Sequence, residues 1–374
     1  MSERRPQGSR RHLPAGVLLY GMYGLSGMDR APTVRIEMMT AALGRLVHTE
    51  QITGGRIGRF GAAVRWLACG GPRRTGAVYV ESATTSAMPT DLAFLALMRL
   101  LGRPVGVYFR DAYQLFRDIH PRQRRRQIVS DLAWRISTPL LAHVATVRFV
   151  PSRGLAEALG FHDAVLLPPG TDTAAPDLGI GEPDVVGAIV QVAPGTGFDS
   201  LLAAMELVRE KRPSARLRLV TRTADPDRLA ALPEWVDVIE SGREGLADAL
   251  RPCRVCVLPL PVNAYTNLAV SVRLLDLIGY GKPVVATDTD ESRRVIEASG
   301  AGTVCAATAQ GLADAILPVL EGESLARRLA ANARRHAVAP GSTWEARARL
   351  VIESAGLAVQ PGLEGGTGPV GARS

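Results

Sequence analysis

The segment with the clearest chemical potential runs from Ser271 to Asp288 and reads Ser-Val-Arg-Leu-Leu-Asp-Leu-Ile-Gly-Tyr-Gly-Lys-Pro-Val-Val-Ala-Thr-Asp. Its apolar spacing predicts a helix that ends at Gly279 and Gly281, and the apolar residues after the proline predict a buried strand. The first turn of a helix presents backbone N–H groups without a partner in the helix, together with the positive end of the helix dipole. Such a turn is a ready binding site for phosphate groups.

Side chains in this predicted helix add to that chemistry. Ser271 and Val272 open the helix, where backbone N–H groups would meet a diphosphate. Arg273 would add a charge-assisted hydrogen bond to the same group. Asp276, about one turn further on, would accept hydrogen bonds from the two hydroxyl groups of a ribose. The four residues together predict a site for a nucleoside diphosphate.

A second set of charged residues follows predicted strands in the first half of the chain. Arg110 and Asp111 come directly after a strand predicted at 104–109, and Glu81 ends the strand predicted at 77–81. Side chains at the carboxyl ends of parallel strands point toward a common ligand site. We therefore expect Asp111, Arg110 and Glu81 to act in catalysis or in binding a second substrate. The alternatives are a helix-capping Asp111 with a surface Arg110, and a structural Glu81.

A glycine-rich loop follows the first predicted strand and reads Tyr-Gly-Met-Tyr-Gly-Leu-Ser-Gly from Tyr20 to Gly27. Glycine lets the backbone approach a ligand closely, so we expect Gly24 and Gly27 to line the site. The spacing of the glycines does not match a dinucleotide-binding fingerprint, and no acidic ribose partner clearly follows the second strand. An ordinary turn between a strand and a helix is the alternative.

These residues are embedded in a regular alternation of short apolar runs and helical patterns, which predicts parallel sheets covered by helices on both faces. Residues 173–184 lack periodicity and are rich in Pro and Gly, which predicts a linker between two Rossmann-like domains. Ligands bind beyond the carboxyl ends of the strands in such domains, so we expect a site in the cleft between them. The predicted strands are 16–20, 47–52, 77–81, 104–109, 146–150, 164–167, 185–192, 216–221, 236–240, 254–258, 283–286 and 303–305.

The predicted domain organisation has six parts. They are a disordered arm (1–14), a first Rossmann-like domain (15–172), the linker (173–184), a second Rossmann-like domain (185–340), a C-terminal helix that returns to the first domain (341–357) and a disordered tail (358–374).

Ser271–Asp288 resembles the donor-site region of family 4 glycosyltransferases, also called glycosyl transferases group 1. The pattern of that region is Ser-Val-(Lys/Arg)-Leu-(Phe/Leu)-Glu, followed four residues later by Gly-(Lys/Arg)-Pro-Val-Val-Ala-Thr-Asp. Phe149–Ser152 together with Leu166–Asp172 is similar to the end of the family's first domain, and Thr196–Asp199 is similar to its Lys-Gly-x-Asp turn. The matches span about residues 149–320, and the part before them matches only in architecture.

The resemblance implies the GT-B fold, in which two Rossmann-like α/β domains face each other across a cleft. It also implies glycosyl transfer from a nucleotide-diphosphate sugar with retention of configuration, no metal and no further cofactor. The sugar donor would bind the second domain through Ser271, Val272, Arg273 and Asp276, with a contribution from Thr196. A glycan or a lipid-linked acceptor would bind the first domain.

Several positions depart from the family pattern. Asp276 replaces the second glutamate of its Glu-x7-Glu pair, and Leu268 stands where the first glutamate would be. Thr196 replaces a lysine that contacts the diphosphate, and an arginine shortly before it has no equivalent, so Arg222 is predicted to compensate. These departures leave two alternative functions open: a non-catalytic homologue that acts as a partner or binds a glycan, and a sugar-nucleotide epimerase.

Composition limits the class of protein. Hydrophobic residues make up 47% and charged residues 21%, as in a globular protein, and no run of about 18 apolar residues predicts a membrane-spanning helix. Four cysteines in 374 residues favour a reducing, cytoplasmic compartment, and Cys253 and Cys256 are expected in the core. Asp288-Thr-Asp290 resembles a metal-binding pair, but Asp290 better suits a helix cap, so no metal site is predicted.

The charge is uneven along the chain. Residues 1–170 carry 23 arginines and 11 acidic residues, whereas the remainder has a net charge of −4. The basic run Arg122-Gln-Arg-Arg-Arg126 precedes an apolar helix. We therefore expect the first domain to dock on an anionic surface at the inner face of the membrane, and a merely solvated helix end is the alternative. Nucleic-acid binding is not expected, because no recognised motif or aromatic series accompanies the charge.

Overall fold

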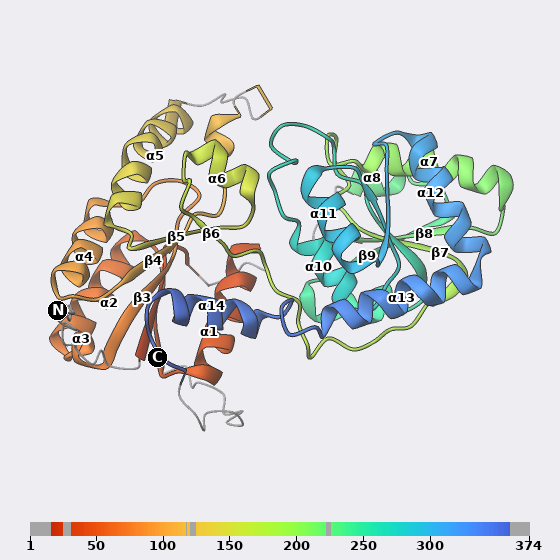
Figure 1. Ribbon diagram of the computed structural model, residues 1–374. Coiled ribbons are helices and arrows are strands. Elements are labelled where there is room, and N and C mark those ends of the chain that lie inside the picture. Colours follow the sequence, from red (N-terminus) through yellow and green to blue (C-terminus); the bar gives the residue numbers. More distant parts are fainter. Residues whose placement is uncertain (1–15, 25–30, 117, 120–124, 222–225, 360–374) are drawn as a thin grey trace, which may run out of the picture.

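The computed structural model contains two α/β domains, each built around a parallel sheet of six strands (Figure 1). Helices cover both faces of each sheet, so the central strands are buried on two sides and read as apolar runs. No helix within the described ranges is both long and apolar enough to cross a membrane. The described residues are 16–24, 31–116, 118–119, 125–221 and 226–359.

The N-terminal sheet has the strand order β2-β1-β3-β4-β5-β6, and all its strand pairs are parallel. Its strands are β1 (Gly16–Gly21), β2 (Thr49–Ile52), β3 (Thr75–Glu81), β4 (Val105–Tyr108), β5 (Val147–Val150) and β6 (Val165–Leu166). The helices of this domain are α1 (Ala31–Leu46), α2 (Arg56–Ala68), α3 (Gly71–Arg74), α4 (Pro89–Leu100), α5 (Arg125–Val144) and α6 (Arg153–Leu159).

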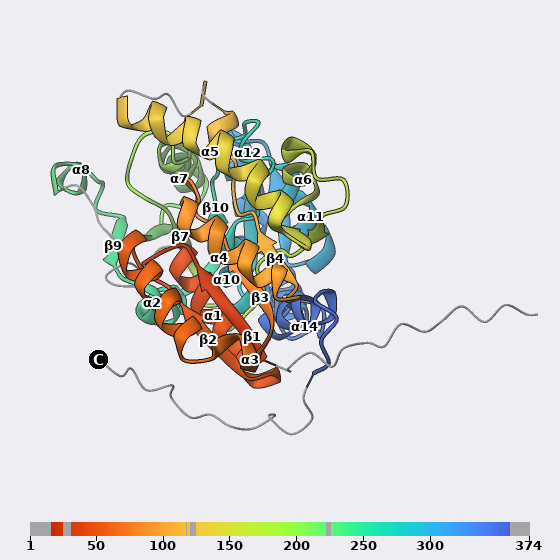
Figure 2. The ribbon, with the colours of Figure 1, turned by 90° about the vertical axis from the view of Figure 1, so that its left-hand side faces the viewer.

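Strand β1 separates two helix layers. Leu18 and Tyr20 point into a core shared with α2, α4 and α5, whereas Val17 and Leu19 point into a core shared with α1 and α14 (Trp344–Ser354). Side chains alternate between the two faces of a strand, so one apolar run serves both layers. Figure 2 shows α2, α4 and α5 next to one another on the side of the domain that faces the viewer.

The C-terminal sheet has the strand order β12-β11-β10-β7-β8-β9 and is also parallel throughout. Its strands are β7 (Glu182–Ile189), β8 (Arg216–Thr221), β9 (Val236–Glu240), β10 (Cys253–Leu258), β11 (Val284–Thr287) and β12 (Gly302–Cys305). The helices are α7 (Phe198–Lys211), α8 (Pro226–Ala230), α9 (Leu246–Leu250), α10 (Val272–Gly279), α11 (Asp290–Ser299), α12 (Ala309–Glu321) and α13 (Glu323–Ala337). The structure confirms all twelve predicted strands, with boundary shifts of up to three residues.

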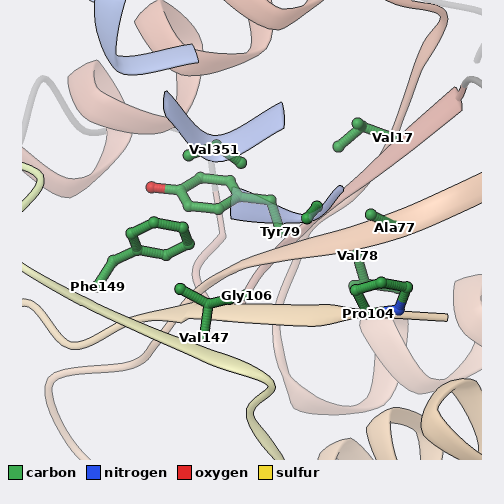
Figure 3. A pocket seen from close by; sticks show the side chains of 10 residues that line it. Val17, Ala77, Val78, Tyr79, Pro104, Gly106, Val147, Phe149 and Val351 are labelled. Carbon is green, nitrogen blue, oxygen red and sulfur yellow. The ribbon is translucent and has the colours of Figure 1, made fainter. Parts of the chain in front are cut away.

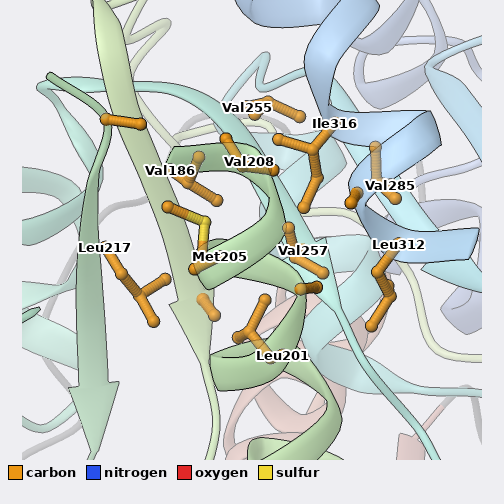
Figure 4. Packing of buried hydrophobic residues seen from close by; sticks show 14 of the residues in the cluster. Val186, Leu201, Met205, Val208, Leu217, Val255, Val257, Val285, Leu312 and Ile316 are labelled. Carbon is orange, nitrogen blue, oxygen red and sulfur yellow. The ribbon is translucent and has the colours of Figure 1, made fainter. Parts of the chain in front are cut away.

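The core of this domain fixes the position of α7 and α12 on one face of the sheet. Met205 of α7 and Ile316 of α12 lie over Val186 and Val257 of the central strands (Figure 4). Helices α9, α10 and α11 pack on the other face. Both Cys253 and Cys256 are buried free cysteines in β10, as expected for core residues.

The chain passes between the domains twice. Thr171 precedes the linker, and its hydroxyl donates a hydrogen bond of 2.6 Å to the carbonyl oxygen of Ala337 at the end of α13. Thr171 also forms an isolated parallel bridge with Thr343, just before α14. Helix α14 then packs against α1 of the N-terminal domain. This contact brings the last described helix of the chain back to the first domain.

A small apolar cavity lies between the N-terminal sheet and α14 (Figure 3). Val17, Gly106 and Val147 line it from the amino-terminal halves of their strands, and Val351 lines it from α14. A Cβ atom at Gly106 would lie 2.7 Å from the Phe149 ring, so glycine leaves room for this ring. Because ligands of parallel sheets bind at the carboxyl ends of the strands, this cavity is not part of the candidate site.

A buried ion pair joins α2 and α4. Arg59 contacts both carboxylate oxygens of Asp91, at 2.9 and 2.8 Å, and the Tyr20 hydroxyl donates a third hydrogen bond of 2.6 Å to Asp91. Burial alone would raise the pKa of Asp91, but the hydrogen bonds from Arg59 and Tyr20 hold it below its ordinary value. The carboxylate is therefore charged, and it fixes the two helices to β1.

Asp91→Asn would leave the Arg59 guanidinium buried without a counter-charge. We expect a loss of about 3–5 kcal/mol in the free energy of unfolding of the N-terminal domain, measured by urea denaturation. The control is Glu323→Gln, which removes an exposed pair with Arg327 on α13 and should leave the free energy of unfolding almost unchanged. Equal effects of the two substitutions would contradict this role of the buried pair.

Candidate functional site

Each sheet has one place where its strand order reverses direction. In the N-terminal sheet the reversal lies between β1 and β3, and in the C-terminal sheet it lies between β7 and β10. Loops that leave two such neighbouring strands go to opposite faces of the sheet, and ligands of open α/β sheets bind in the opening between them. The topology thus defines two half-sites, one in each domain.

Helix α10 begins at the C-terminal half-site. Ser271 is its N-cap residue, and the Ser271 hydroxyl accepts a hydrogen bond of 3.4 Å from the N–H of Leu274. Leu274, Leu277 and Ile278 are buried in the core below the helix. This apolar face fixes the helix, so its first turn, including Val272, is held at the carboxyl end of the sheet as the sequence predicts.

Arg273 extends from the first turn of α10 to β7. Its Nη1 atom donates a hydrogen bond of 2.8 Å to the carbonyl oxygen of Ile189, the last residue of β7. The Arg273 side chain is exposed, so its guanidinium lies at the surface next to the first turn of α10. One guanidinium and the start of one helix therefore lie together where the strand order reverses.

The turn after β7 approaches the loop after β10 very closely. Gly197 has φ +86°, and a Cβ atom there would lie 1.4 Å from the carbonyl oxygen of Pro259. Only glycine fits this position. The neighbouring Thr196 hydroxyl lies 2.8 Å from the carbonyl oxygen of Gln191 and 2.7 Å from that of Ala193. Thr196 thus stabilises its own loop through a hydrogen bond to the backbone.

Asp276 has a partner that the sequence analysis missed. Arg243 places Nη1 3.2 Å from Asp276 Oδ1 and Nη2 3.6 Å from Asp172 Oδ2. Asp172 stands just before the linker, so Arg243 joins the linker region to α10. The only sign in the sequence is that Arg243 follows the predicted strand 236–240 at its carboxyl end. The arginine adds a positive charge beside the carboxylate that was predicted to bind ribose.

Arg110 and Asp111 lie at the N-terminal half-site. Arg110 Nε is 3.4 Å from Asp111 Oδ2, and both side chains are largely buried. Asp111 lines a small pocket between α5 and the ends of β3 and β4, together with Ser82, Ser137 and Thr138. A carboxylate in a pocket with several hydroxyl groups can orient a hydroxyl-bearing ligand or accept its proton.

The loop after β1 reaches the same place. The Arg110 guanidinium lies 6.0 Å from the ring centre of Tyr23, whose hydroxyl accepts a hydrogen bond of 2.7 Å from the N–H of Thr84. Burial raises the pKa of Tyr23 to about 12, although the positive charge of Arg110 opposes this. Gly24 follows Tyr23 directly, so this loop lies beside Arg110.

Tyr265 of the C-terminal domain connects the two half-sites. It lies between β10 and α10, and its ring is 5.9 Å from that of Phe116 in the loop after β4. Burial raises the pKa of Tyr265 well above its ordinary value; the Asp111 carboxylate raises it further and Arg110 lowers it. Asp111 and Arg110 thus act electrostatically across the domain boundary.

Leu268 occupies a second contact between the domains. Its carbonyl oxygen accepts a hydrogen bond of 2.6 Å from the hydroxyl of Ser152, which follows β5. Its side chain packs with Ala112, Trp134 and Leu155 of the N-terminal domain. The position at which the family pattern has its first glutamate therefore serves in this protein as an apolar contact between the domains.

Glu81 does not join the candidate site. It is 1% exposed, and its Oε1 atom accepts hydrogen bonds from Arg35 at 2.9 Å and from the Tyr79 hydroxyl at 2.6 Å. The Arg35 guanidinium lies 3.5 Å from the ring centre of Tyr108. Because Glu81 is the last residue of β3, it points toward a face of the sheet, into a buried network. We interpret it as the structural partner of Arg35.

Three further expectations have different outcomes. Gly27 and Arg222 lie outside the described residues. The expectation that Asp290 caps a helix is wrong, because the cap of α11 is Thr289, whose hydroxyl accepts from the N–H of Ser292 at 3.3 Å. Asp288 forms an ion pair with Arg293.

The two facing Rossmann-like domains define the GT-B class of fold. Residues 184–322 match the family model described as Glycosyl transferases group 1. This match lies in the C-terminal domain and confirms the predicted resemblance. A comparison with curated proteins finds no match.

Solved structures with this fold extend over nearly the whole chain. Sucrose-phosphate synthase from Thermosynechococcus elongatus is 14% identical with a TM-score of 0.63, covering 90% of this chain and 97% of its own. HepE from Anabaena in complex with UDP is 15% identical with a TM-score of 0.64, and the match covers 91% of this chain and 99% of the HepE chain. WaaG, a glycosyltransferase involved in lipopolysaccharide biosynthesis, is 16% identical with a TM-score of 0.60. The match covers 89% of this chain and 99% of the WaaG chain. At these identities the likeness establishes the fold.

Arg273→Ala removes the guanidinium from the first turn of α10. We expect it to weaken nucleoside diphosphate binding by about 1.5–3 kcal/mol, the range for hydrogen bonds to charged groups. Titration calorimetry with a panel of nucleoside diphosphates measures the change, and Arg327→Ala on the exposed face of α13 is the control. Unchanged affinity of the Arg273 variant would locate the phosphates elsewhere.

Asp276→Asn tests the predicted ribose contact. The parent protein should prefer ribonucleoside diphosphates to their 2′-deoxy counterparts, and the variant should lose this preference, because an amide accepts fewer hydrogen bonds than a carboxylate. Competition binding gives the ratio of the two affinities. Asp172→Asn is the matched control, since Asp172 shares Arg243 but lies off α10. The same loss in both variants would assign the effect to Arg243.

Proposed function

We propose that this protein transfers a glycosyl group from a nucleotide-diphosphate sugar to the hydroxyl group of an acceptor, in the synthesis of a glycan. The observation that carries the proposal is the start of α10 beside Arg273 at the reversal of strand order, inside the residues that match the glycosyltransferase family. The proteins with this fold include HepE, solved with UDP and glucose. We propose that a nucleotide sugar binds this chain at the start of α10.

The donor diphosphate would bind the N–H groups of the first turn of α10 and the Arg273 guanidinium. As the bond between the sugar carbon and the diphosphate oxygen breaks, negative charge grows on that oxygen, and the helix dipole and Arg273 stabilise it. These groups supply the charge that a metal ion would otherwise give, so we propose a reaction without metal or further cofactor. By resemblance to the family, the configuration at the sugar carbon is retained.

The acceptor would bind the pocket beside Asp111. Its hydroxyl oxygen forms the new bond to the sugar carbon, its proton passes to the Asp111 carboxylate, and the nucleoside diphosphate leaves. Arg110 holds that carboxylate in place, and Gly24 allows close approach of the sugar. We propose a glycan or lipid-linked acceptor at the cytoplasmic face of a membrane, because the N-terminal domain carries the excess of positive charge.

A second function, a non-catalytic partner or glycan-binding protein, is favoured by two observations. Leu268 fills a domain contact where the family pattern has a glutamate, and Thr196 bonds to its own loop where the pattern has a lysine. A sugar-nucleotide epimerase also stays open, since a Listeria monocytogenes structure assigned as a UDP-N-acetylglucosamine 2-epimerase has a TM-score of 0.52 at 14% identity, covering 91% of this chain and 95% of its own. That reaction calls for several carboxylates and a histidine around the sugar, whereas the donor half-site described above offers Asp276 and Asp172.

The experiment that separates these functions is a hydrolysis and transfer assay with a panel of nucleotide sugars. We expect release of nucleoside diphosphate by the parent protein, whereas a binding protein would bind the nucleotide sugar without turnover. Epimerisation would change the sugar while it stays attached to the diphosphate.

Asp111→Asn should lower this turnover by roughly 10²–10⁴-fold, because the amide cannot take up the acceptor proton. Donor affinity should stay unchanged, since Asp111 is in the other domain. Asp118→Asn, an exposed aspartate a few residues further on, is the control and should keep normal turnover. Normal turnover of a folded Asp111 variant would remove this residue from the reaction.

A further inference from the structure

The outer face of the N-terminal domain is unusually apolar. We call the outward-facing side of α2, α4 and α5 the three-helix face. Among the described residues, fifteen large hydrophobic side chains are exposed, and eleven of them lie on this face. They are Ile57, Phe60 and Val64 on α2, Leu97, Leu100 and Leu101 at the end of α4, and Ile128, Val129, Leu132, Ile136 and Leu140 on α5.

The exposed apolar side chains lie on the opposite side of the helix from the buried ones. On α5 the buried residues Asp131, Trp134 and Leu141 face the sheet, and the exposed stripe Leu132 and Ile136 lies on the opposite side of the helix. The three helices cover the same face of the sheet and lie next to one another in both views (Figures 1 and 2). The exposed apolar side chains therefore lie on three neighbouring helices that cover one face of the sheet.

Several of these apolar side chains are exposed over most of their area. Ile57 is 88% exposed, Leu100 is 85% exposed and Val129 is 67% exposed. Apolar side chains scattered singly over a surface are normal, whereas many exposed together on neighbouring helices indicate an interaction surface.

The exposed charged side chains named on the three helices are all positive. Arg56, Arg65, Arg99 and Arg135 are exposed. The acidic residues within the bounds of α2, α4 and α5 are Asp91 and Asp131, and each is 2% exposed. A second copy of this face would bring arginines against arginines, which disfavours a symmetric dimer through it. A surface that is apolar and positively charged fits the interface of an anionic lipid bilayer.

We propose that the three-helix face inserts shallowly into an anionic lipid bilayer, with its apolar side chains among the upper acyl chains and its arginines at the headgroups. Helix α5 has two roles in this arrangement. Its outward stripe enters the bilayer, while Ser137 and Thr138 on its other sides line the pocket of Asp111. The pocket then lies close to the lipid headgroups, which, resting on the proposed function, suits an acceptor carried by a lipid.

The apolar contribution distinguishes this proposal from attraction of charge alone. Attraction between arginines and anionic lipids weakens strongly when salt screens it, whereas burial of apolar surface persists. Binding should therefore fall but not vanish at high salt, and it should depend on apolar residues that carry no charge.

The test is co-flotation of the full chain with vesicles of phosphatidylcholine containing about 30% phosphatidylglycerol, with pure phosphatidylcholine vesicles for comparison. The parent protein should float with the anionic vesicles. The variants L132Q/I136Q on α5 and I57Q/L100Q on α2 and α4 keep every arginine, and each should weaken binding on the order of tenfold. The matched control L166Q/V338Q removes two exposed apolar side chains elsewhere and should bind like the parent.

Three results would overturn the proposal. One is a parent protein that floats with neither kind of vesicle, and another is a control variant that loses as much binding as the face variants. A parent oligomer in solution that the face variants dissociate would assign the face to a protein contact. Nucleoside diphosphate binding, measured on the same samples, separates this proposal from the proposed function. Vesicle binding without nucleotide binding would refute only the proposed function. Nucleotide binding without vesicle binding would refute only the proposal that this face inserts into a bilayer.

Discussion

A parallel sheet with helices on both faces confines polar chemistry to the ends of its strands. Every residue of β1 and β10 is buried, so side chains that must reach a ligand are placed where the strands stop. Both domains place their candidate groups there: Arg110 and Asp111 beyond β4, and the start of α10 beyond β10. The contact of Gly197 with Pro259 shows how tightly the loops around such a strand end are packed. This confinement decides which residues meet, although they are far apart in the sequence.

The same constraint explains how much of the fold is predictable. Strands buried on two sides are short apolar runs rich in β-branched residues, so all twelve can be located from the sequence alone. Helices with a polar outer face are nearly as clear. Helix α2 is harder, because Ile57, Phe60 and Val64 are apolar on the side that faces away from the core, and two glycines interrupt it. Its hydrophobic pattern therefore does not identify the buried face.

The candidate site is only partly predictable from the sequence. Sequence patterns identify candidate residues, but contacts with distant residues decide what each of them does. The start of α10 near Ser271 depends on neighbouring residues, so the sequence indicates it. Glu81 and Asp111 look equivalent in the sequence, yet Glu81 is inside β3 and points to a buried face, whereas Asp111 lies beyond the strand end. The sequence does not reveal the roles of Arg243, Tyr265 and Leu268, because each contacts a residue of the linker region or of the other domain.

The return of α14 to the first domain has a consequence for how the chain matures. Domains generally fold in order as they leave the ribosome. In this protein the N-terminal sheet is complete after β6, but the core around Val17 and Leu19 also needs Trp344 and Ile352. This core therefore stays partly exposed to solvent until the whole second domain has been translated. Because α14 is synthesised late, the nascent chain depends on protection from aggregation during this interval.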